Sequence, residues 1–194
     1  MRKNLGAKPL CHPQPVFVVA AYGDNSLPCA MVAAWGGITA RKEVTLCLDR
    51  GHLTVDALRR TGFFTISMAT ARYEKQCDFL GIVSGRKVPD KVAKAGFHVR
   101  KAEFINAPLI EELPLALECR LISYDEEREL VRAEIVNVSA DESILSEDGK
   151  VSAELLQPLC FDPFDDSYRT VGSVAGKAFK DGEALKEQDI FICG

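Results

Sequence analysis

The stretch LALECRLISYDEERELVRAEIVNVSADE, residues 115 to 142, decides the fold class. In its first half the apolar residues Leu117, Cys119 and Leu121 alternate with polar ones, which is the pattern of an antiparallel strand with one face exposed. A second run of similar length follows, and the charged residues 126–128 between the two runs suit the tip of a turn. The stretch therefore predicts a long β-hairpin.

Several segments outside this hairpin are rich in β-branched and aromatic residues, which is typical of strands. These segments are VFVVAAY at 16–22, VTLCLD at 44–49 and FFTISMAT at 63–70. Short helices are expected at 53–62, 73–83, 89–95 and 152–159. The chain has no internal repeat and no break in composition, so we expect one domain over 1–194, mainly antiparallel strands closing into a barrel with a few peripheral helices. Residues 161–194 are expected to form an irregular tail that wraps the body.

Composition and charge narrow the class of protein. The 194 residues carry 24 Lys and Arg against 28 Asp and Glu, a net charge of −4, with no long basic block. This balance argues against a broad nucleic-acid surface and favours a small anion as any charged ligand. No apolar run approaches the roughly 20 residues that span a bilayer, and residues 1–16 do not resemble a signal peptide, so we expect no membrane segment and a cytoplasmic protein.

No motif supplies self-contained chemistry. The seven cysteines lie at 11, 29, 47, 77, 119, 160 and 193 without a Cys-x-x-Cys pair, so neither a disulfide framework nor a metal site is expected, and most should be buried thiols. The histidines at 12, 52 and 98 do not complete a metal-binding pattern. Since the chain also has no P-loop, Gly-x-Ser-x-Gly or Gly-x-Gly-x-x-Gly motif, no catalytic residue is assigned, and an enzyme of this sequence would depend on an organic cofactor.

The run AMVAAWGG, residues 30–37, is made mostly of small residues and ends near the single tryptophan, Trp35. Small side chains allow a planar ring to approach the backbone. The alternative is that two sheets or two subunits pack tightly here. The sequence leaves both interpretations open.

Two segments are candidates for binding an anion. In DRGHLTVDAL, residues 49–58, Arg50, His52 and Thr54 stand at the start of the predicted helix, where backbone N–H groups and a guanidinium suit a phosphate. The alternative is that Thr54 is only an N-cap and Arg50 a solvated charge. The second segment is the basic turn SGRKVPDK at 84–91, and the two form one site only if the fold brings them together.

Taken in order, five segments resemble a known family: PQPVFVVAAYGDNSLPCAMVAAWGG, RGHLTVDAL, GFFTISMAT, SGRKVPDK and YRTVGSVAGKAF. They resemble the flavin reductase-like, FMN-binding split-barrel proteins, and specifically the flavoredoxin-like branch, over roughly residues 8–182. The resemblance implies an antiparallel split β-barrel that binds FMN.

The resemblance also implies which residues hold the cofactor. Beside the isoalloxazine ring it places Ala30, Met31, Val32, Ala33, Ala34, Trp35, Ser67, Met68 and Ala69. At the phosphate end it places Arg50, His52, Thr54, Ser84, Gly85, Arg86 and Lys91. Ser67 stands where relatives often have Asn, and Lys87 has no assigned role.

The function implied by the resemblance is hydride transfer from NADH or NADPH to flavin N5, the activity of an NAD(P)H:flavin oxidoreductase. A non-catalytic FMN electron carrier serving protein partners is the alternative, because no nicotinamide motif is present. A barrel binding another planar phosphate or tetrapyrrole ligand is a third possibility. Relatives of this kind resemble homodimers in which the second chain covers part of each flavin site.

Overall fold

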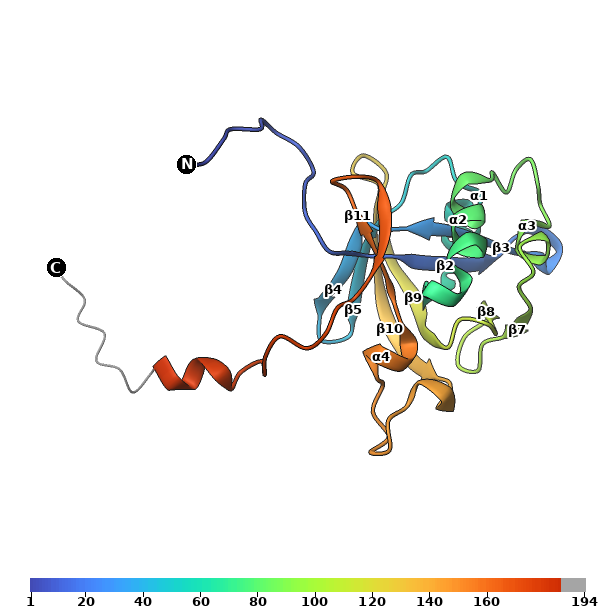
Figure 1. The fold of residues 1–194 in the computed structure, drawn as a ribbon. Helices are drawn as coiled ribbons and strands as arrows, with labels where there is room; N and C mark the ends of the chain where they lie inside the picture. Colours follow the sequence, from blue (N-terminus) through green and yellow to red (C-terminus); the bar gives the residue numbers. More distant parts are fainter. Residues whose placement is uncertain (186–194) are drawn as a thin grey trace.

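A computed structural model of the chain describes residues 1–185 (Figure 1). The strands are β1 (Gln14–Pro15), β2 (Phe17–Tyr22), β3 (Pro28–Ala33), β4 (Gly36–Ala40), β5 (Glu43–Cys47), β6 (Phe63–Met68), β7 (Val99–Lys101), β8 (Pro108–Ile110), β9 (Leu115–Asp125), β10 (Leu130–Ala140), β11 (Leu159–Asp162) and β12 (Ser167–Thr170). The helices are α1 (Leu53–Thr61), α2 (Glu74–Ile82), α3 (Lys91–Lys94) and α4 (Ala153–Leu156), with 3-10 turns at Asp24–Ser26, Ala71–Tyr73, Glu142–Ile144 and Asp181–Leu185.

The main layer is a curled antiparallel sheet of seven strands in the order β3-β2-β6-β9-β10-β5-β4, which forms a half-barrel (Figure 1). The predicted hairpin is confirmed as β9 and β10, which pair along most of their length with two register shifts. Such bulges bend a strand and help a sheet to curl. The chain is therefore mainly β with a few peripheral helices, as the sequence predicts.

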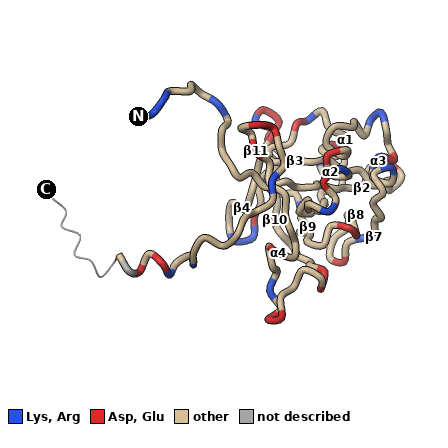
Figure 2. Tube along the Cα trace, viewed as in Figure 1, with Lys and Arg blue, Asp and Glu red and all other residues tan. Residues whose placement is uncertain are grey.

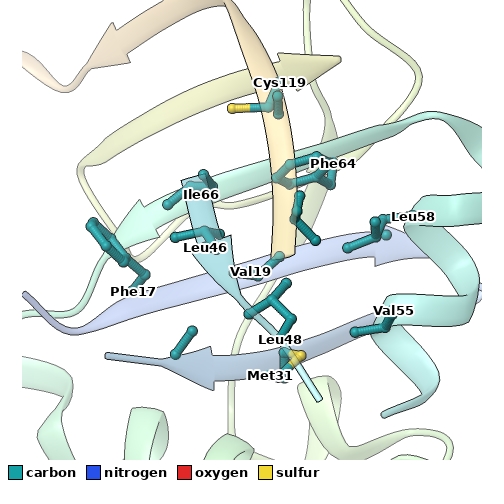
Figure 3. Close-up of a cluster of buried hydrophobic side chains, with 14 of the residues drawn as sticks. Phe17, Val19, Met31, Leu46, Leu48, Val55, Leu58, Phe64, Ile66 and Cys119 are labelled. Carbon is teal, nitrogen blue, oxygen red and sulfur yellow. The ribbon is translucent and has the colours of Figure 1, made fainter. Parts of the chain in front are cut away.

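The core lies on both faces of β2 and β3. On the inner face of the curl, Val55 and Leu58 of α1 pack against Phe64, Ile66 and other strand residues (Figure 3). On the opposite face, α2 and α3 pack against the same two strands. Burial on both faces explains why β2 is a continuous apolar run rather than an alternating one.

The predicted strands at 16–22, 44–49 and 63–70 are confirmed as β2, β5 and β6, and the predicted first helix is α1. This helix ends at Gly62, whose φ of 74° is a left-handed C-cap conformation that favours glycine. The last predicted helix, 152–159, is shorter than expected: α4 ends at Leu156, and residues 159–162 form β11.

The prediction of an irregular tail is wrong for residues 161–170. This part of the chain contains β11 and β12, which form a hairpin that pairs with β1. Residues 171–185 lead away from the body instead of wrapping it (Figure 1). The rest of the predicted tail, 186–194, lies outside the described residues, as does Cys193.

Within residues 1–185, Cys29, Cys77, Cys119 and Cys160 are buried free thiols. This confirms the prediction that most cysteines are buried and unpaired. No helix in this part of the chain combines the length and apolar character needed to cross a membrane. The same residues contain no cluster of three or more His, Cys, Asp or Glu suited to a metal ion.

Candidate functional site

The fold brings the two predicted anion-binding segments together. Nε of Arg86 donates a hydrogen bond of 3.2 Å to the carbonyl oxygen of Gly51, which precedes α1. An Nη atom of the same guanidinium donates one of 2.6 Å to a carboxylate oxygen of Asp56, in the first turn of α1. Arg86 therefore fastens the 84–91 turn to the start of α1, and part of its charge is matched by Asp56.

Gly85 lies against the same helix start. A Cβ placed on Gly85 would lie 3.3 Å from Cδ2 of Leu53 and 3.6 Å from Cε of Lys91. The missing side chain of glycine thus permits the close approach of the turn to α1. A pocket of about 400 Å³ opens at this junction. Its lining comprises Gly23, Asp24, Asn25, Leu27, Cys29, Leu53, Gly85, Arg86 and Pro89.

The N-terminus of α1 is free to bind an anion. His52 is its N-cap residue, but no side chain caps the helix, and the carbonyl of His52 accepts from the N–H of Val55 at 3.0 Å. Within the described residues, the backbone N–H groups of Leu53 and Thr54 have no hydrogen-bond acceptor. Unsatisfied N–H groups at a helix start suit a phosphate. The alternative that Thr54 is the N-cap is wrong, since Thr54 lies inside the helix.

Lys91 lies beside Gly85, one of the residues that line the pocket, and its ammonium group is buried. Its side chain is 4% exposed, and Nζ donates hydrogen bonds of 2.7 Å to the carbonyl oxygens of Leu80 and Val83, at the end of α2. Burial lowers the pKa of Lys91 from its ordinary value of 10.5. None of the ion pairs among the described residues includes Lys91. Lys91 is therefore not a solvated residue of its helix.

The neighbouring thiol of Cys29 does not neutralise this charge. Sγ of Cys29 donates to the carbonyl oxygen of Ala21 at 3.2 Å. Burial raises the pKa of Cys29, although the Thr54 hydroxyl and the positive charge of Lys91 act in the opposite direction. A thiol with a raised pKa is neutral near pH 7 and a weak nucleophile. The base of the pocket thus carries a buried positive charge without a protein counterion nearby.

The predicted ring-binding run lies on an edge strand. In the described chain, β3 pairs as a strand with β2 alone, so its other edge presents backbone N–H and C=O groups. Ala30 and Val32 belong to the face that packs on α2, whereas Met31 and Ala33 belong to the inner face. A planar ligand can approach this edge closely because several of its side chains are small.

The remaining predicted ring residues are divided between the two faces. Met68 lies on the inner face beside Phe17, which also pairs with Ala33. Ser67 and Ala69 lie on the opposite face and are buried, and Oγ of Ser67 has no hydrogen-bond partner. The structure therefore does not bring Ser67 to the same surface as Met68. Ala34 is half-buried, and Trp35 is exposed at the end of β3.

Of the other predicted phosphate residues, His52 is half-buried, whereas Arg50 and Ser84 are exposed. The backbone N–H of Arg50 donates to a carboxylate oxygen of Glu129 at 3.2 Å, so the tip of the β9–β10 hairpin supports the loop before α1. The pocket is also lined by Leu53, Cys29 and residues of the 23–27 loop, which were not predicted as site residues. The turn sequence GDNS, residues 23–26, was a signal for the loop only.

Comparison with known proteins gives a consistent set of matches. A family model described as "Flavin reductase like domain" matches residues 10–171. A solved structure of flavoredoxin from Desulfovibrio vulgaris (Miyazaki F) is 35% identical, with a TM-score of 0.89, covering 94% of this chain and 100% of that one. A flavoredoxin from Methanosarcina acetivorans is 28% identical, with a TM-score of 0.83 and coverage of 95% and 98%.

A curated relative, an uncharacterized protein of Aeropyrum pernix, is 33% identical over 69 residues. The match covers 36% of this chain and 26% of that protein's length. It therefore contributes local similarity, whereas the flavoredoxin structures match over nearly their whole length.

Proposed function

The chain belongs to the flavin reductase-like, FMN-binding family and to its flavoredoxin branch, and on this premise we propose that it is an NAD(P)H:flavin oxidoreductase with FMN as cofactor. FMN, when bound, supplies a ring that accepts a hydride and passes electrons onward. The chain itself binds, orients and encloses the reactants, since no acid or base is needed for the hydride.

One observation carries the FMN proposal: the uncapped start of α1 and the buried side chain of Lys91, which has no counterion, both lie against Gly85, a lining residue of the pocket. The N–H groups of Leu53 and Thr54 and the ammonium of Lys91 would hold the phosphate. A phosphate would supply the negative charge that no described protein group near Lys91 provides. Arg86 would support this end indirectly, because it holds the turn against Gly51 and Asp56.

The ring would lie along the free edge of β3, from Ala30 to Trp35. A flavin ring carries hydrogen-bond donors and acceptors along one side, which the backbone of an edge strand can match. Met68 is the other predicted ring contact on the inner face near Ala33. Ser67 would act on the ring only through its neighbours, since its hydroxyl is buried on the opposite face.

A second candidate function is a non-catalytic FMN electron carrier serving protein partners, and the similarity to two flavoredoxins favours it. Anaerobic mixing of the FMN-loaded protein with NADH or NADPH separates the two. Rapid loss of the visible flavin absorbance supports the reductase. An inert flavin that is reduced only by a protein donor would make the carrier the correct function.

The proposal includes a homodimer. Trp35, Ile38 and Val138 leave large apolar side chains exposed on the half-barrel, at 53%, 64% and 53%. Apolar surface of this kind in a soluble domain commonly marks an interface. Light scattering with FMN bound should give twice the 21.3 kDa mass of one chain. A monomer mass at micromolar concentration would contradict it.

A further inference from the structure

The loop between β2 and β3, residues 23–27, forms one wall of the pocket and has an unusual backbone. All of its residues except Ser26 line the pocket. Asn25 and Ser26 have φ angles of 53° and 59°, in the left-handed region that residues other than glycine rarely adopt. Such conformations persist where surrounding contacts hold the chain, and they are common at ligand clamps. The shape of this loop therefore depends on a contact from outside it.

Arg60, in the last turn of α1, supplies that contact. One Nη atom of Arg60 donates to a carboxylate oxygen of Asp24, and the other donates to the carbonyl oxygen of Tyr22 at 3.3 Å. Among the described residues outside the loop, only Arg60 has a side chain that makes a hydrogen bond to the loop. The start of α1 borders the pocket, so this one helix forms part of the pocket and also holds its opposite wall.

The ion pair with Arg60 also cancels a charge of the wrong sign. Asp24 lines the pocket and its side chain is exposed, so its carboxylate would repel a phosphate if it were unpaired. Asp56, at the start of α1, is matched by Arg86 in the same way. Figure 2 shows Lys and Arg interspersed with Asp and Glu on the side of the molecule that carries α1, α2 and α3. Arg60 therefore affects both the position of the loop and the charge of the pocket.

We infer that residues 23–27 form a gate over the pocket, and that Arg60 is a positioning residue that holds this gate closed through Asp24. Loss of the ion pair would let the two left-handed residues relax. Leu27 lines both this pocket and a neighbouring apolar cavity of about 260 Å³ beside α3, so it has space into which to move. That the gate admits FMN rests on the proposed function, whereas the gate itself rests on the contacts of the loop.

Two buried thiols allow the gate to be observed without FMN. Cys29 lines the pocket and is 2% exposed, and its Sγ would lie 3.9 Å from a Cβ placed on Gly23 of the loop. Cys77, on α2, is equally buried but does not line the pocket, so it reports opening of the whole fold. Labelling of the flavin-free protein with iodoacetamide, followed by mass spectrometry of the peptides, measures the exposure of each thiol over time.

Arg60→Met should raise the labelling rate of Cys29 by about 2- to 5-fold, the effect of one exposed ion pair, and leave that of Cys77 unchanged. The positive charge of Arg60 lowers the pKa of Cys29, so loss of this charge alone would slow the labelling. Asp24→Asn should give a similar increase, and combining the two substitutions should add little, because both remove the same contact.

The matched control is Arg59→Met, which removes the neighbouring ion pair to Glu126 in the β9–β10 hairpin and should leave both labelling rates unchanged. The inference is overturned if Arg60→Met leaves the labelling of Cys29 unchanged, if Arg59→Met raises it equally, or if the labelling of Cys77 rises in parallel.

The release of FMN separates failure of the gate from failure of the proposed function. After dilution of the FMN-loaded protein, recovery of flavin fluorescence should be faster for Arg60→Met than for Arg59→Met, by a factor similar to that for Cys29 labelling. Faster labelling of Cys29 with unchanged release of FMN would support the gate and contradict the placement of FMN in this pocket.

Discussion

Replacing Lys91 by methionine tests the proposed phosphate contact, because methionine keeps the length of the side chain and removes its charge. The side chain of Lys91 lies beside Gly85, a lining residue of the pocket, and none of the ion pairs among the described residues includes it. A charge-assisted contact to a phosphate is worth about 1.5 to 3 kcal/mol. Lys91→Met should therefore weaken FMN binding by roughly 10- to 150-fold.

The structure also predicts a cost in stability. Nζ of Lys91 donates to the carbonyl oxygens of Leu80 and Val83, and both lose this donor in the variant. The gain from no longer burying a charge offsets part of the loss, so the free energy of unfolding should fall by about 1 to 2 kcal/mol. Urea denaturation of the flavin-free protein measures this change. FMN binding is measured under conditions in which the variant is folded.

The matched control is Lys94→Met, on the same helix. Lys94 is exposed and its Nζ lies 3.1 Å from a carboxylate oxygen of Asp90, a surface pair worth at most about 0.5 kcal/mol. Titration of each variant with FMN and with riboflavin, followed by quenching of flavin fluorescence, gives the decisive comparison. The phosphate assignment is refuted if Lys91→Met weakens both flavins equally, since riboflavin carries no phosphate. Lys91 would then act only by holding the end of α2.

Three further outcomes follow from the structure. Gly85→Ala places a Cβ 3.3 Å from Leu53 and should weaken FMN binding several-fold in the same titration. The control Gly182→Ala places a Cβ with nothing within 4 Å and should leave FMN binding unchanged. Equal effects of the two variants would show that the close approach of the 84–91 turn to α1 does not matter for binding. Burial lowers the pKa of Lys91 below 10.5, and of the two forms of this side chain only the charged one attracts phosphate. Calorimetry should therefore show that the affinity for FMN, relative to that for riboflavin, falls as the pH rises through this pKa. Lys91→Met should abolish the pH dependence. Phe64→Ala, at a fully buried position, should lower the free energy of unfolding by about 3 to 5 kcal/mol in denaturant titrations, and a loss below about 1 kcal/mol would contradict the described core.

The parts of the fold that were predictable have strong local patterns. The first strand of the β9–β10 hairpin alternates apolar and polar residues over 117–121, and α1 has an apolar face followed by Gly62. By contrast, β3 and β4 were missed because AMVAAWGG lacks the β-branched density of a strand. The β11–β12 hairpin was missed because its sequence is rich in Asp and its pairing with β1 joins residues far apart in the chain.

The same distinction holds for the candidate site. Each anion-binding segment was visible in the sequence as basic residues near a helix start or a turn. Their contact depends on the Arg86 hydrogen bonds to Gly51 and Asp56, which no local pattern encodes. The burial of Lys91 was not predictable: PDKVAKAG has the composition of a solvated helix, and the carbonyl groups that accept from the lysine come from the end of α2.

The proposed function depends most on the pocket between α1 and the 84–91 turn, which we propose binds the phosphate of FMN. Titration of the purified, flavin-free protein with FMN and riboflavin in parallel tests it most directly. FMN should bind at least about 10-fold more tightly than riboflavin, the effect of one charge-assisted contact to phosphate. Equal affinity for the two flavins would contradict it.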